Sequence, residues 1–464
     1  VYLLFPHEHI LPSLNNMKSV LILGAGLSNG PMIPYLANHS IKVILASRTL
    51  AKAQKMIDGV PNAEAVQADV ENDAGMSIIA KLIPTVDGVV SMLPYIHHCK
   101  VARLAIEHKK HFFTTSYVSD EMKTLNDEAI TAGITMINEC GVDPGTDHMS
   151  AMRLINRFRS QGGKTTKFLS YCGGLPSPAN NTNCLGYKFS WAPRGVLLAS
   201  RNNAHFLLDG AETDTPAKDL FSTYMKDSIE GVGELHCYPN RDSTKYISVY
   251  NLQHVKTMIR GTYRFPGWCD TIHQLVQLGF LSLDAAELGG KTYRSLVAGM
   301  VGVEDGEGVE AAALKFLSLA ADSVVAANLR WLGIFSTEAV PAGTTTLLDS
   351  LCHLMQTRMG YAEGERDMIA MKHTFEAEFD DRVEEWTSSM VYEGQPLPAG
   401  PSAMANTVSL PVAIAVRMVL EGKITQRGIV IPIDPEVYNP ILDELENVGI
   451  KFVEKLVKVT KKSA

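Results

Sequence analysis

The sequence predicts an α/β protein whose first domain is a doubly wound parallel sheet. Three observations carry this prediction. An apolar run at 20–23 ends abruptly in closely spaced glycines, and further apolar runs of strand length alternate with amphipathic stretches as far as residue 143. The first strand, helix and strand together take about 30 residues, the usual size of a βαβ unit. Such alternation favours a parallel sheet covered by helices on both faces.

The glycine turn is the first element with a chemical meaning. The strand at 20–23 is followed by GAGLSNG at 24–30. We expect a Rossmann-type dinucleotide site here, because glycines permit a tight turn and let the backbone approach a pyrophosphate at the start of the next helix. The spacing is G-x-G-x-x-x-G, so an ordinary glycine-rich strand-to-helix turn is the alternative.

The other elements of this domain follow in alternation. Strands are expected at 41–46, 65–68, 88–92, 111–115 and 134–137, and helices at 32–38, 100–108 and 119–132. Gly133 is placed to cap the last of these helices.

The pattern changes after Gly145. Glycine- and proline-rich turns and strands at 167–172 and 258–264 indicate a sheet-based domain, and 275–359 is mainly helical, most clearly at 311–329. A helix at 402–421 and a strand at 428–432 follow. The expected domains are a dinucleotide-binding domain at 17–143 with 402–432 packed on it, a mixed-sheet substrate domain at 144–274, a helical domain at 275–360, and a return to the substrate domain at 361–401.

Bulk properties narrow the class of protein. A chain of 464 residues is too long for one compact core, and a net charge of −8 gives no basic footprint for nucleic acid. Seven cysteines without a C-x-x-C pair fit reduced thiols in an intracellular compartment. No apolar run approaches the roughly 18 residues of a membrane span, so no membrane partner is expected.

The two ends of the chain carry weaker signals. Residues 1–16 lack the basic region and cleavage pattern of a secretory signal, and they precede a Met17 that resembles a natural start, so we expect an extension or linker. The lysine-bearing tail at 451–464 is expected to be a solvated helix end.

The end of the second strand bears on the choice of cofactor. An acid at this place would bind the ribose 2′-hydroxyl of NAD, whereas an arginine accommodates the 2′-phosphate of NADP. The sequence has Ser47 and Arg48 here, and no carboxylate before Asp58. We therefore expect NADP, with NAD as the alternative; an Arg48 that merely faces solvent is the competing interpretation.

Polar residues follow two later strands of the same sheet. Thr115, Ser116 and Tyr117 follow one strand, and Asp143 lies in the turn after another. The carboxyl edge of such a sheet binds ligands, so these groups could orient a substrate or handle protons. A helix N-cap for Ser116 and a simple turn for Asp143 are the alternatives.

Arginines in the middle of the chain suggest recognition of carboxylates. Arg241 lies in a predicted turn, and Arg260 and Arg264 are in phase on one strand, which puts both on the same side. Surface salt bridging is the alternative.

The motifs of several other enzyme classes are absent from the sequence, namely Tyr-x-x-x-Lys, H-E-x-x-H and G-x-S-x-G. The adjacent His97 and His98 would point in different directions on a helix, so no metal site is expected.

Six ordered motifs make the chain resemble the glutamate-forming saccharopine dehydrogenase family, also called saccharopine reductases. They are TSYVS at 115–119, NECGVDPGTDHM at 138–149, SYCGGLPSP at 170–178, YKFSW at 187–191, YPNRDST at 238–244 and RGTYR at 260–264. The resemblance implies a Rossmann domain, a mixed α+β substrate domain and a helical insertion. It also implies interconversion of saccharopine with glutamate and 2-aminoadipate 6-semialdehyde, by hydride transfer between a nicotinamide and an imine.

The resemblance also implies site residues. Cofactor contacts are expected at Gly24, Gly26, Leu27, Ser28, Ser47, Arg48, Asp69, Val70, Thr115, Ser116, Gly141, Val142, Asp143 and Trp191. Substrate contacts are expected at Ser116, Tyr117, Asp143, Arg241, Thr262, Tyr263 and Arg264. The catalytic candidates are Asp143, as electrostatic partner or proton acceptor of an iminium, and Tyr117, which could donate or position a proton. No single general base is assigned.

Two departures from the family pattern leave alternatives open. Leu27 and Ser28 stand where relatives usually have an aromatic residue and a valine, and 434–442 looks more like the dehydrogenase half of bifunctional lysine-degrading enzymes. The direction, biosynthesis or degradation of lysine, thus stays open, as does the compartment, cytoplasmic or mitochondrial, and the case for NADP is weakened. The competing functions are a related reductase that forms carboxylated polyamines and an inactive NADP(H)-binding scaffold. A homodimer is expected.

Overall fold

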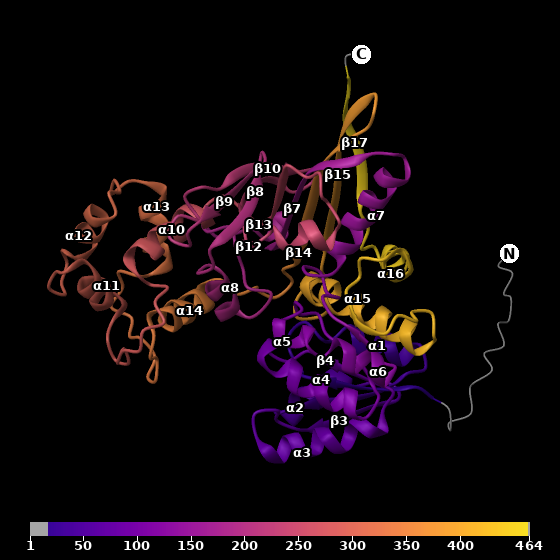
Figure 1. The fold of residues 1–464 in the computed structure, drawn as a ribbon. Coiled ribbons are helices and arrows are strands. Elements are labelled where there is room, and N and C mark those ends of the chain that lie inside the picture. Colours follow the sequence, from indigo (N-terminus) through magenta and orange to yellow (C-terminus); the bar gives the residue numbers. More distant parts are fainter. Residues whose placement is uncertain (1–16, 463–464) are drawn as a thin grey trace, which may run out of the picture. The chain divides into compact units, whose positions relative to one another are not determined.

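The computed structural model describes residues 17–462, and the proposed extension at 1–16 lies outside them. The described chain forms two compact units (Figure 1). Unit 1 runs to His148 and includes Ala405–Glu444, and unit 2 comprises Met149–Met404 and the chain from Leu445 onward. The finer division into three domains remains a prediction.

Unit 1 contains a seven-stranded parallel sheet with the strand order β16-β6-β5-β4-β1-β2-β3. Its strands are β1 (Ser19–Leu23), β2 (Lys42–Ser47), β3 (Ala63–Gln67), β4 (Gly88–Ser91), β5 (His111–Phe113), β6 (Thr135–Ile137) and β16 (Gly428–Val430). The predicted doubly wound fold class is confirmed. Because the winding reverses between β1 and β4, the carboxyl ends of these two strands define the place where such sheets bind ligands.

The strands form because their apolar runs are buried on both faces. Val20, Leu21 and Ile22 of β1 are fully buried, as expected of a central parallel strand. The covering helices are α1 (Met32–Asn38), α2 (Leu50–Ile57), α3 (Asp73–Leu82), α4 (His98–Glu107), α5 (Asp120–Lys123) and α6 (Asn126–Ala132). The single helix expected at 119–132 is therefore wrong, since two short helices occupy it, but the cap at Gly133 is confirmed by its φ of 72°.

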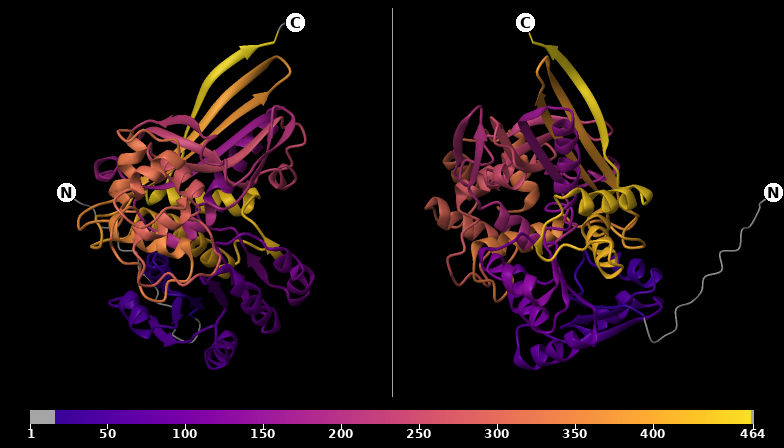
Figure 2. Two further views of the ribbon diagram at one scale, coloured as in Figure 1. Left: turned by 90° about the vertical axis from the view of Figure 1, so that its left-hand side faces the viewer. Right: turned by 45° about the vertical axis from the view of Figure 1, so that its right-hand side comes forward.

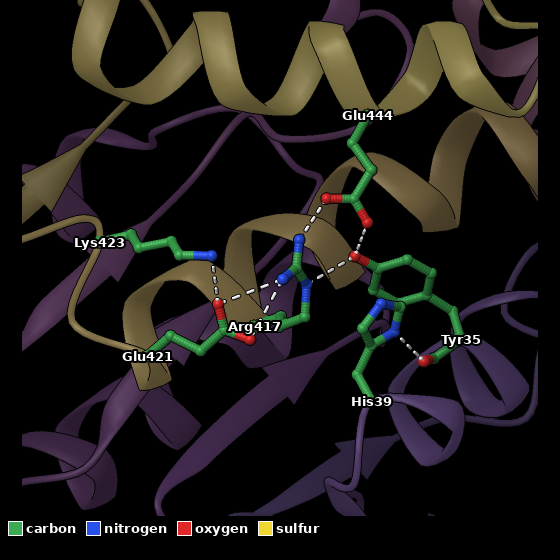
Figure 3. A network of polar contacts seen from close by, with 6 residues as sticks. All are labelled: Tyr35, His39, Arg417, Glu421, Lys423 and Glu444. Carbon is green, nitrogen blue, oxygen red and sulfur yellow. Dashed lines mark hydrogen bonds and ion pairs between the residues drawn. The ribbon is translucent and has the colours of Figure 1, made fainter. Parts of the chain in front are cut away.

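The C-terminal part of unit 1 comprises β16, which pairs with β6, and two helices, α15 (Ala403–Leu420) and α16 (Pro435–Asn447). Arg417 of α15 pairs with Glu444 of α16, and its Nε donates to the Tyr35 hydroxyl of α1 at 2.9 Å (Figure 3). The Tyr35 hydroxyl also donates to Glu444. These contacts join three helices that are far apart in sequence.

One helix of the described chain, α15, is long and apolar enough to cross a membrane by length and composition. Its 18 residues have a mean hydropathy of 1.6, and 83% of them are buried. The expectation that no apolar run approaches this length was therefore wrong. The burial is that of a helix packed inside a protein core.

Unit 2 is built on a ten-stranded mixed sheet with the central order β10-β11-β13-β7-β14-β15-β17. Its strands are β7 (Lys164–Pro176), β8 (Ala204–Leu208), β9 (Ala211–Thr215), β10 (Met225–Ile229), β11 (Gly233–Pro239), β12 (Arg241–Asp242), β13 (Thr257–Arg264), β14 (Asp367–Glu378), β15 (Arg382–Glu393) and β17 (Val453–Lys461). Only β13 with β7 and β12 with β8 pair in parallel among the described strands of this sheet. Figure 2 shows β17, in yellow, running along the orange β14–β15 hairpin.

Six helices of unit 2 share one apolar core with the sheet. They are α8 (Pro193–Ala199), α10 (Trp268–Leu278), α11 (Tyr293–Val301), α12 (Val309–Phe316), α13 (Val324–Leu332) and α14 (Leu347–Arg358). The helices α7 (Thr146–Ser160) and α9 (Lys245–Val249) also belong to this part of the chain. Two expectations were wrong here. The stretch at 311–329 is split, because α12 ends at Phe316 and Ser323 caps α13 by accepting from the Ala326 amide. The tail is the strand β17 and not a helix end, because it pairs with β15.

Candidate functional site

The glycine turn of unit 1 is built by one close approach and one buried side chain. Gly24 has a φ of 107°, and a Cβ there would lie 2.9 Å from the carbonyl oxygen of Met92. Asn29, which is 1% exposed, donates from Nδ2 to the Gly24 carbonyl at 2.8 Å. At Gly26 a Cβ would meet only the Asn29 amide, at 3.8 Å. The backbone at Gly26 is therefore open to a ligand, as a phosphate site requires.

A pocket of about 300 Å³ lies beside this turn, at the carboxyl ends of β1 to β4. Among the predicted cofactor residues it brings together Gly24, Gly26, Ser47, Arg48, Asp69 and Val70. Leu27 and Ser28 belong to the turn but do not line the pocket, and the Leu27 side chain is 74% exposed. The other predicted cofactor residues of unit 1, Thr115, Ser116, Gly141, Val142 and Asp143, also lie outside its lining.

The end of the pocket at β2 carries two cations. Arg48 follows β2 directly, and Lys52 lies in the first turn of α2. The Ser47 hydroxyl accepts from the Thr49 amide at 3.2 Å. Sequence reasoning missed Lys52, although its position four residues after Arg48 on the following helix is a usable signal. Two exposed cations beside a hydroxyl suit a phosphate group.

Acidic residues also reach this pocket, and both have protein partners. Glu71 lies 3.6 Å from the His97 imidazole, and the Asp69 carboxylate accepts from the Glu71 amide at 3.0 Å. Sequence reasoning missed Glu71 and His97 as lining residues. Nothing in the local sequence identifies these two residues as pocket residues. Glu71 follows β3 and His97 follows β4, and it is the order of the strands in the sheet that brings these two segments to one pocket.

The two catalytic candidates meet at the carboxyl edge of unit 1. Tyr117, after β5, donates from its hydroxyl to the Asp143 carboxylate, after β6, at 3.3 Å. Both side chains are half-buried. Asp143 lies in a tight turn in which a Cβ at Gly145 would come within 2.2 Å of the Gly141 carbonyl oxygen. The turn therefore requires glycine at position 145 and fixes the place of Asp143.

The loop that carries Ser116 and Tyr117 is held by a buried carboxylate that the sequence did not single out. Glu139, 6% exposed, accepts from the Val118 amide at 3.0 Å and lies 2.8 Å from His148 Nε2. Its own amide donates to the Ser116 carbonyl at 3.0 Å. Gly141 lies against Thr115, since a Cβ at Gly141 would be 3.1 Å from that of Thr115. The ends of β5 and β6 thus form one hydrogen-bonded patch.

In unit 2, Arg264 is a buried cation among aromatic rings. It is 7% exposed, and its guanidinium lies 4.8 Å from the Tyr187 ring and 5.2 Å from the Trp268 ring. Its Nη1 donates to the Tyr263 carbonyl at 2.8 Å, and within residues 17–462 its Nε has no hydrogen-bond partner. A buried cation without a carboxylate partner is costly, so the site is suited to an anionic ligand.

Further unsatisfied polar atoms belong to the same part of unit 2. Among the described residues, Tyr187 Oη, Trp268 Nε1, Ser190 Oγ and Tyr361 Oη are buried without a well-formed hydrogen bond. Burial raises the pKa of Tyr187, so its hydroxyl keeps its proton and can donate. Buried polar groups usually find partners, and these atoms offer donors to a polar ligand.

The remaining substrate candidates have different surroundings. Arg241, expected in a turn, instead begins the short strand β12, where it is exposed and has a φ of 57°. Tyr263 is fully buried and its hydroxyl donates to Asp227, which Lys372 also contacts at 2.7 Å. Thr262 is partly exposed on the same strand.

Arg260 and Trp191 are two further candidate residues of unit 2. Arg260 lies 4.0 Å from the Tyr246 ring, whereas Arg264 lies against other rings. Positions four residues apart on a strand lie about 13 Å apart, and the two guanidinium groups contact different rings. Trp191, expected at the cofactor, belongs to unit 2, where it packs against Gly195.

Comparisons with known proteins cover nearly the whole chain. Residues 20–137 match the family model described as the saccharopine dehydrogenase NADP binding domain, and 141–450 match the saccharopine dehydrogenase C-terminal domain. The saccharopine dehydrogenase [NADP(+), L-glutamate-forming] of Pyricularia oryzae is 40% identical, over 95% of this chain and 99% of that protein. The mitochondrial α-aminoadipic semialdehyde synthase of Rattus norvegicus is 34% identical over 95% of this chain, which spans 48% of that protein.

A solved structure shows the same architecture. The apo saccharopine dehydrogenase (L-Glu forming) from Saccharomyces cerevisiae has 37% identity and a TM-score of 0.86, and the match covers 95% of this chain and 100% of that one.

Proposed function

The chain belongs to the saccharopine dehydrogenase family, and from this premise we propose that it interconverts saccharopine with glutamate and 2-aminoadipate 6-semialdehyde, using NADP. It is then an oxidoreductase of lysine metabolism. The observation that carries the proposal is the match of both family domains over 20–137 and 141–450. A carboxylated-polyamine reductase and an inactive scaffold are not favoured, because the relatives are named as saccharopine dehydrogenases or α-aminoadipic semialdehyde synthases.

The residues of unit 1 fit NADP. The open backbone at Gly26 accommodates the pyrophosphate, and Arg48 and Lys52 provide the positive charge that a 2′-phosphate needs. When bound, the cofactor supplies the hydride chemistry, while the protein supplies orientation and electrostatics. The carboxylates in this pocket do not argue for NAD, because both already have protein partners. Glu71 lies beside the His97 imidazole, and Asp69 accepts a hydrogen bond from the Glu71 amide.

The Tyr117–Asp143 pair is proposed to serve the reacting nitrogen. A carboxylate beside an iminium stabilises its positive charge, and a carboxylate can also accept a proton from the amine. The 3.3 Å contact lets Asp143 hold the Tyr117 hydroxyl in one direction. This contact supports a shared role for the two side chains in orienting the substrate and handling its proton.

The cations of unit 2 are proposed to bind substrate carboxylates. Saccharopine carries three carboxylates, and arginine forks bind such groups with two hydrogen bonds. Arg264 has an unsatisfied Nε, and Arg241 is solvent-accessible. The buried Tyr187 and Tyr361 hydroxyls add neutral donors that would make the same region selective for a polar, anionic substrate.

Steady-state turnover of saccharopine with NADP and with NAD, in parallel, tests the proposal. We expect turnover with a preference for NADP. Turnover of a polyamine precursor but not of saccharopine would replace the substrate, and a marked preference for NAD would remove the argument from Arg48 and Lys52. Binding of NADPH without turnover in either direction, under conditions where a relative is active, would indicate a scaffold.

We also propose a homodimer that uses the edge strand β17. This strand pairs only with β15 within the described sheet, and it exposes Val457 at 60% and Val453, Leu456 and Val459 at 46% each. An unpaired edge with exposed apolar side chains readily pairs with another strand.

Light scattering of the double variant Val457→Lys/Val459→Lys tests the dimer. We expect a monomer, whereas Val324→Lys, at a 75% exposed apolar residue of α13, should leave the dimer intact. A parent protein that is monomeric at micromolar concentration would contradict this proposal.

A further inference from the structure

A buried histidine of unit 1, His98, joins the ends of two neighbouring strands. It is the first residue of α4 and is 3% exposed. Its Nδ1 lies 2.8 Å from the Ser91 hydroxyl at the end of β4. Its Nε2 lies 2.8 Å from the Ser116 hydroxyl and 3.2 Å from that of Thr114, both just after β5. One imidazole therefore contacts three hydroxyls at the carboxyl edge of the sheet.

The imidazole is neutral at physiological pH. Burial, and to a smaller extent the neighbouring His97, lowers the pKa of His98 to about 4. A neutral imidazole has one N–H donor and one acceptor nitrogen. Ser91 and Ser116 can each donate or accept, so both ring nitrogens are satisfied in either tautomer of His98.

We infer that His98 is a positioning residue for the reaction, because it fixes the orientation of the Ser116 hydroxyl and thereby the segment Thr114–Tyr117. The inference rests on the proposed function, in which Ser116 contacts cofactor and substrate and Tyr117 pairs with Asp143. Glu139 holds this segment through backbone amides, whereas His98 holds its hydroxyls. Because the Ser116 hydroxyl is hydrogen-bonded to His98 in either tautomer, its rotamer does not have to be fixed by the ligand.

Two substitutions of His98 test the contacts of its two ring nitrogens separately. In His98→Gln the amide group reaches the place of Nε2, so it can still contact Ser116 while losing Ser91. In His98→Asn the shorter amide reaches the place of Nδ1, so it keeps Ser91 and loses Ser116. The two variants have the same chemistry and differ in which hydroxyl they hold. His108→Asn, at the other end of α4, is the control.

We expect His98→Asn to lower kcat for saccharopine about tenfold or more, with NADPH affinity little changed, and His98→Gln to retain most of the parent kcat. In the Ser116→Ala background, His98→Asn should have little further effect, because the contact through which it acts is already absent. Equal losses in the two His98 variants, or an undiminished loss in the Ser116→Ala background, would overturn the inference.

A second measurement does not depend on turnover. In protein labelled with ¹⁵N-histidine, the His98 resonances are identified by their loss in His98→Gln. They should report a neutral ring at pH 6, and Ser116→Ala should shift the Nε2 resonance while leaving His111 unchanged. A His98 ring that is unaffected by Ser116→Ala would exclude the contact even if the parent enzyme were inactive on saccharopine.

Discussion

At the scale of single residues, the site of unit 1 depends on contacts that fix short polar side chains. Asn29 holds the glycine turn through the Gly24 carbonyl, and Glu139 holds the loop after β5 through the Val118 amide. Arg48 and Lys52, by contrast, are exposed at the rim of the pocket. The buried groups set the geometry of the site, and the exposed cations are proposed to set which cofactor binds.

The cations give the first prediction. Arg48→Ala/Lys52→Ala should raise the KM for NADP about tenfold or more and leave the KM for NAD nearly unchanged, because only NADP carries the 2′-phosphate. Each charge-assisted hydrogen bond is worth about 1.5–3 kcal/mol. Steady-state kinetics with both cofactors measures this. Lys55→Ala, at an exposed lysine of the same helix, should change neither constant, and equal effects on both cofactors would contradict the assignment.

The second prediction concerns the pH dependence of stability. Burial lowers the pKa of His98 from 6.5 to about 4, so between these values the unfolded chain binds a proton that the folded chain does not. The free energy of unfolding of the parent should therefore fall as the pH decreases from 6.5 to 4, by about 3 kcal/mol from this group. His98→Gln lacks this contribution. Denaturant unfolding at pH 7 and pH 5 should show a smaller loss in the variant; parallel losses would contradict the burial argument.

At the scale of secondary-structure elements, long-range polar contacts decide how the C-terminal helices join unit 1. Arg417 of α15 contacts Glu444 of α16 and Tyr35 of α1, and its side chain is only 11% exposed. Nearby, Lys423 pairs with Glu421 at 2.8 Å but is 59% exposed. Both pairs appear in Figure 3. Removing one partner of a partly buried ion pair lowers the free energy of unfolding substantially, whereas an exposed pair contributes little to it.

The third prediction follows from this contrast. Arg417→Met should destabilise the protein by about 1–3 kcal/mol, because Glu444 and Tyr35 lose a partner in a partly buried place. Lys423→Met should change stability by less than about 0.5 kcal/mol. Unfolding of the cofactor-free protein in urea provides the comparison. Similar urea midpoints for the two variants would contradict a stabilising role for the contacts of Arg417 with Glu444 and Tyr35.

At the scale of the whole molecule, the predicted site residues divide between the two units. The glycine turn, Arg48 and the Tyr117–Asp143 pair belong to unit 1, and Arg241 and Arg264 belong to unit 2. A substitution of Arg241 in unit 2 should thus affect substrate binding without affecting cofactor binding.

The fourth prediction is that Arg241→Ala raises the KM for saccharopine about tenfold or more and changes the Kd of NADPH less than twofold, because a charged hydrogen bond to a carboxylate is lost. Fluorescence titration gives the Kd, and steady-state rates give the KM. Arg201→Ala, at another exposed arginine of unit 2, is the control. Unchanged saccharopine kinetics in Arg241→Ala would remove Arg241 from the site.

Local patterns predicted much of the fold and part of the site. The apolar runs predicted the six strands from β1 to β6, and the glycines and Ser47-Arg48 predicted a nucleotide pocket, because strand burial and turn chemistry are properties of neighbouring residues. Breaks within helical stretches were missed at 119–132 and 311–329. In the tail at 453–461, pairing with β15 decided the structure against the expected helix.

The sequence by itself determined the family, the parallel sheet and the residue types available for hydride chemistry. Only the tertiary structure decided that Lys52 and His97 line the pocket, that Glu139 and His98 hold the Ser116 loop, and that Arg264 lies among aromatic rings with an unsatisfied Nε. The reason is physical. Element formation follows from short-range periodicity, whereas these contacts join residues whose separation in space depends on strand order and burial.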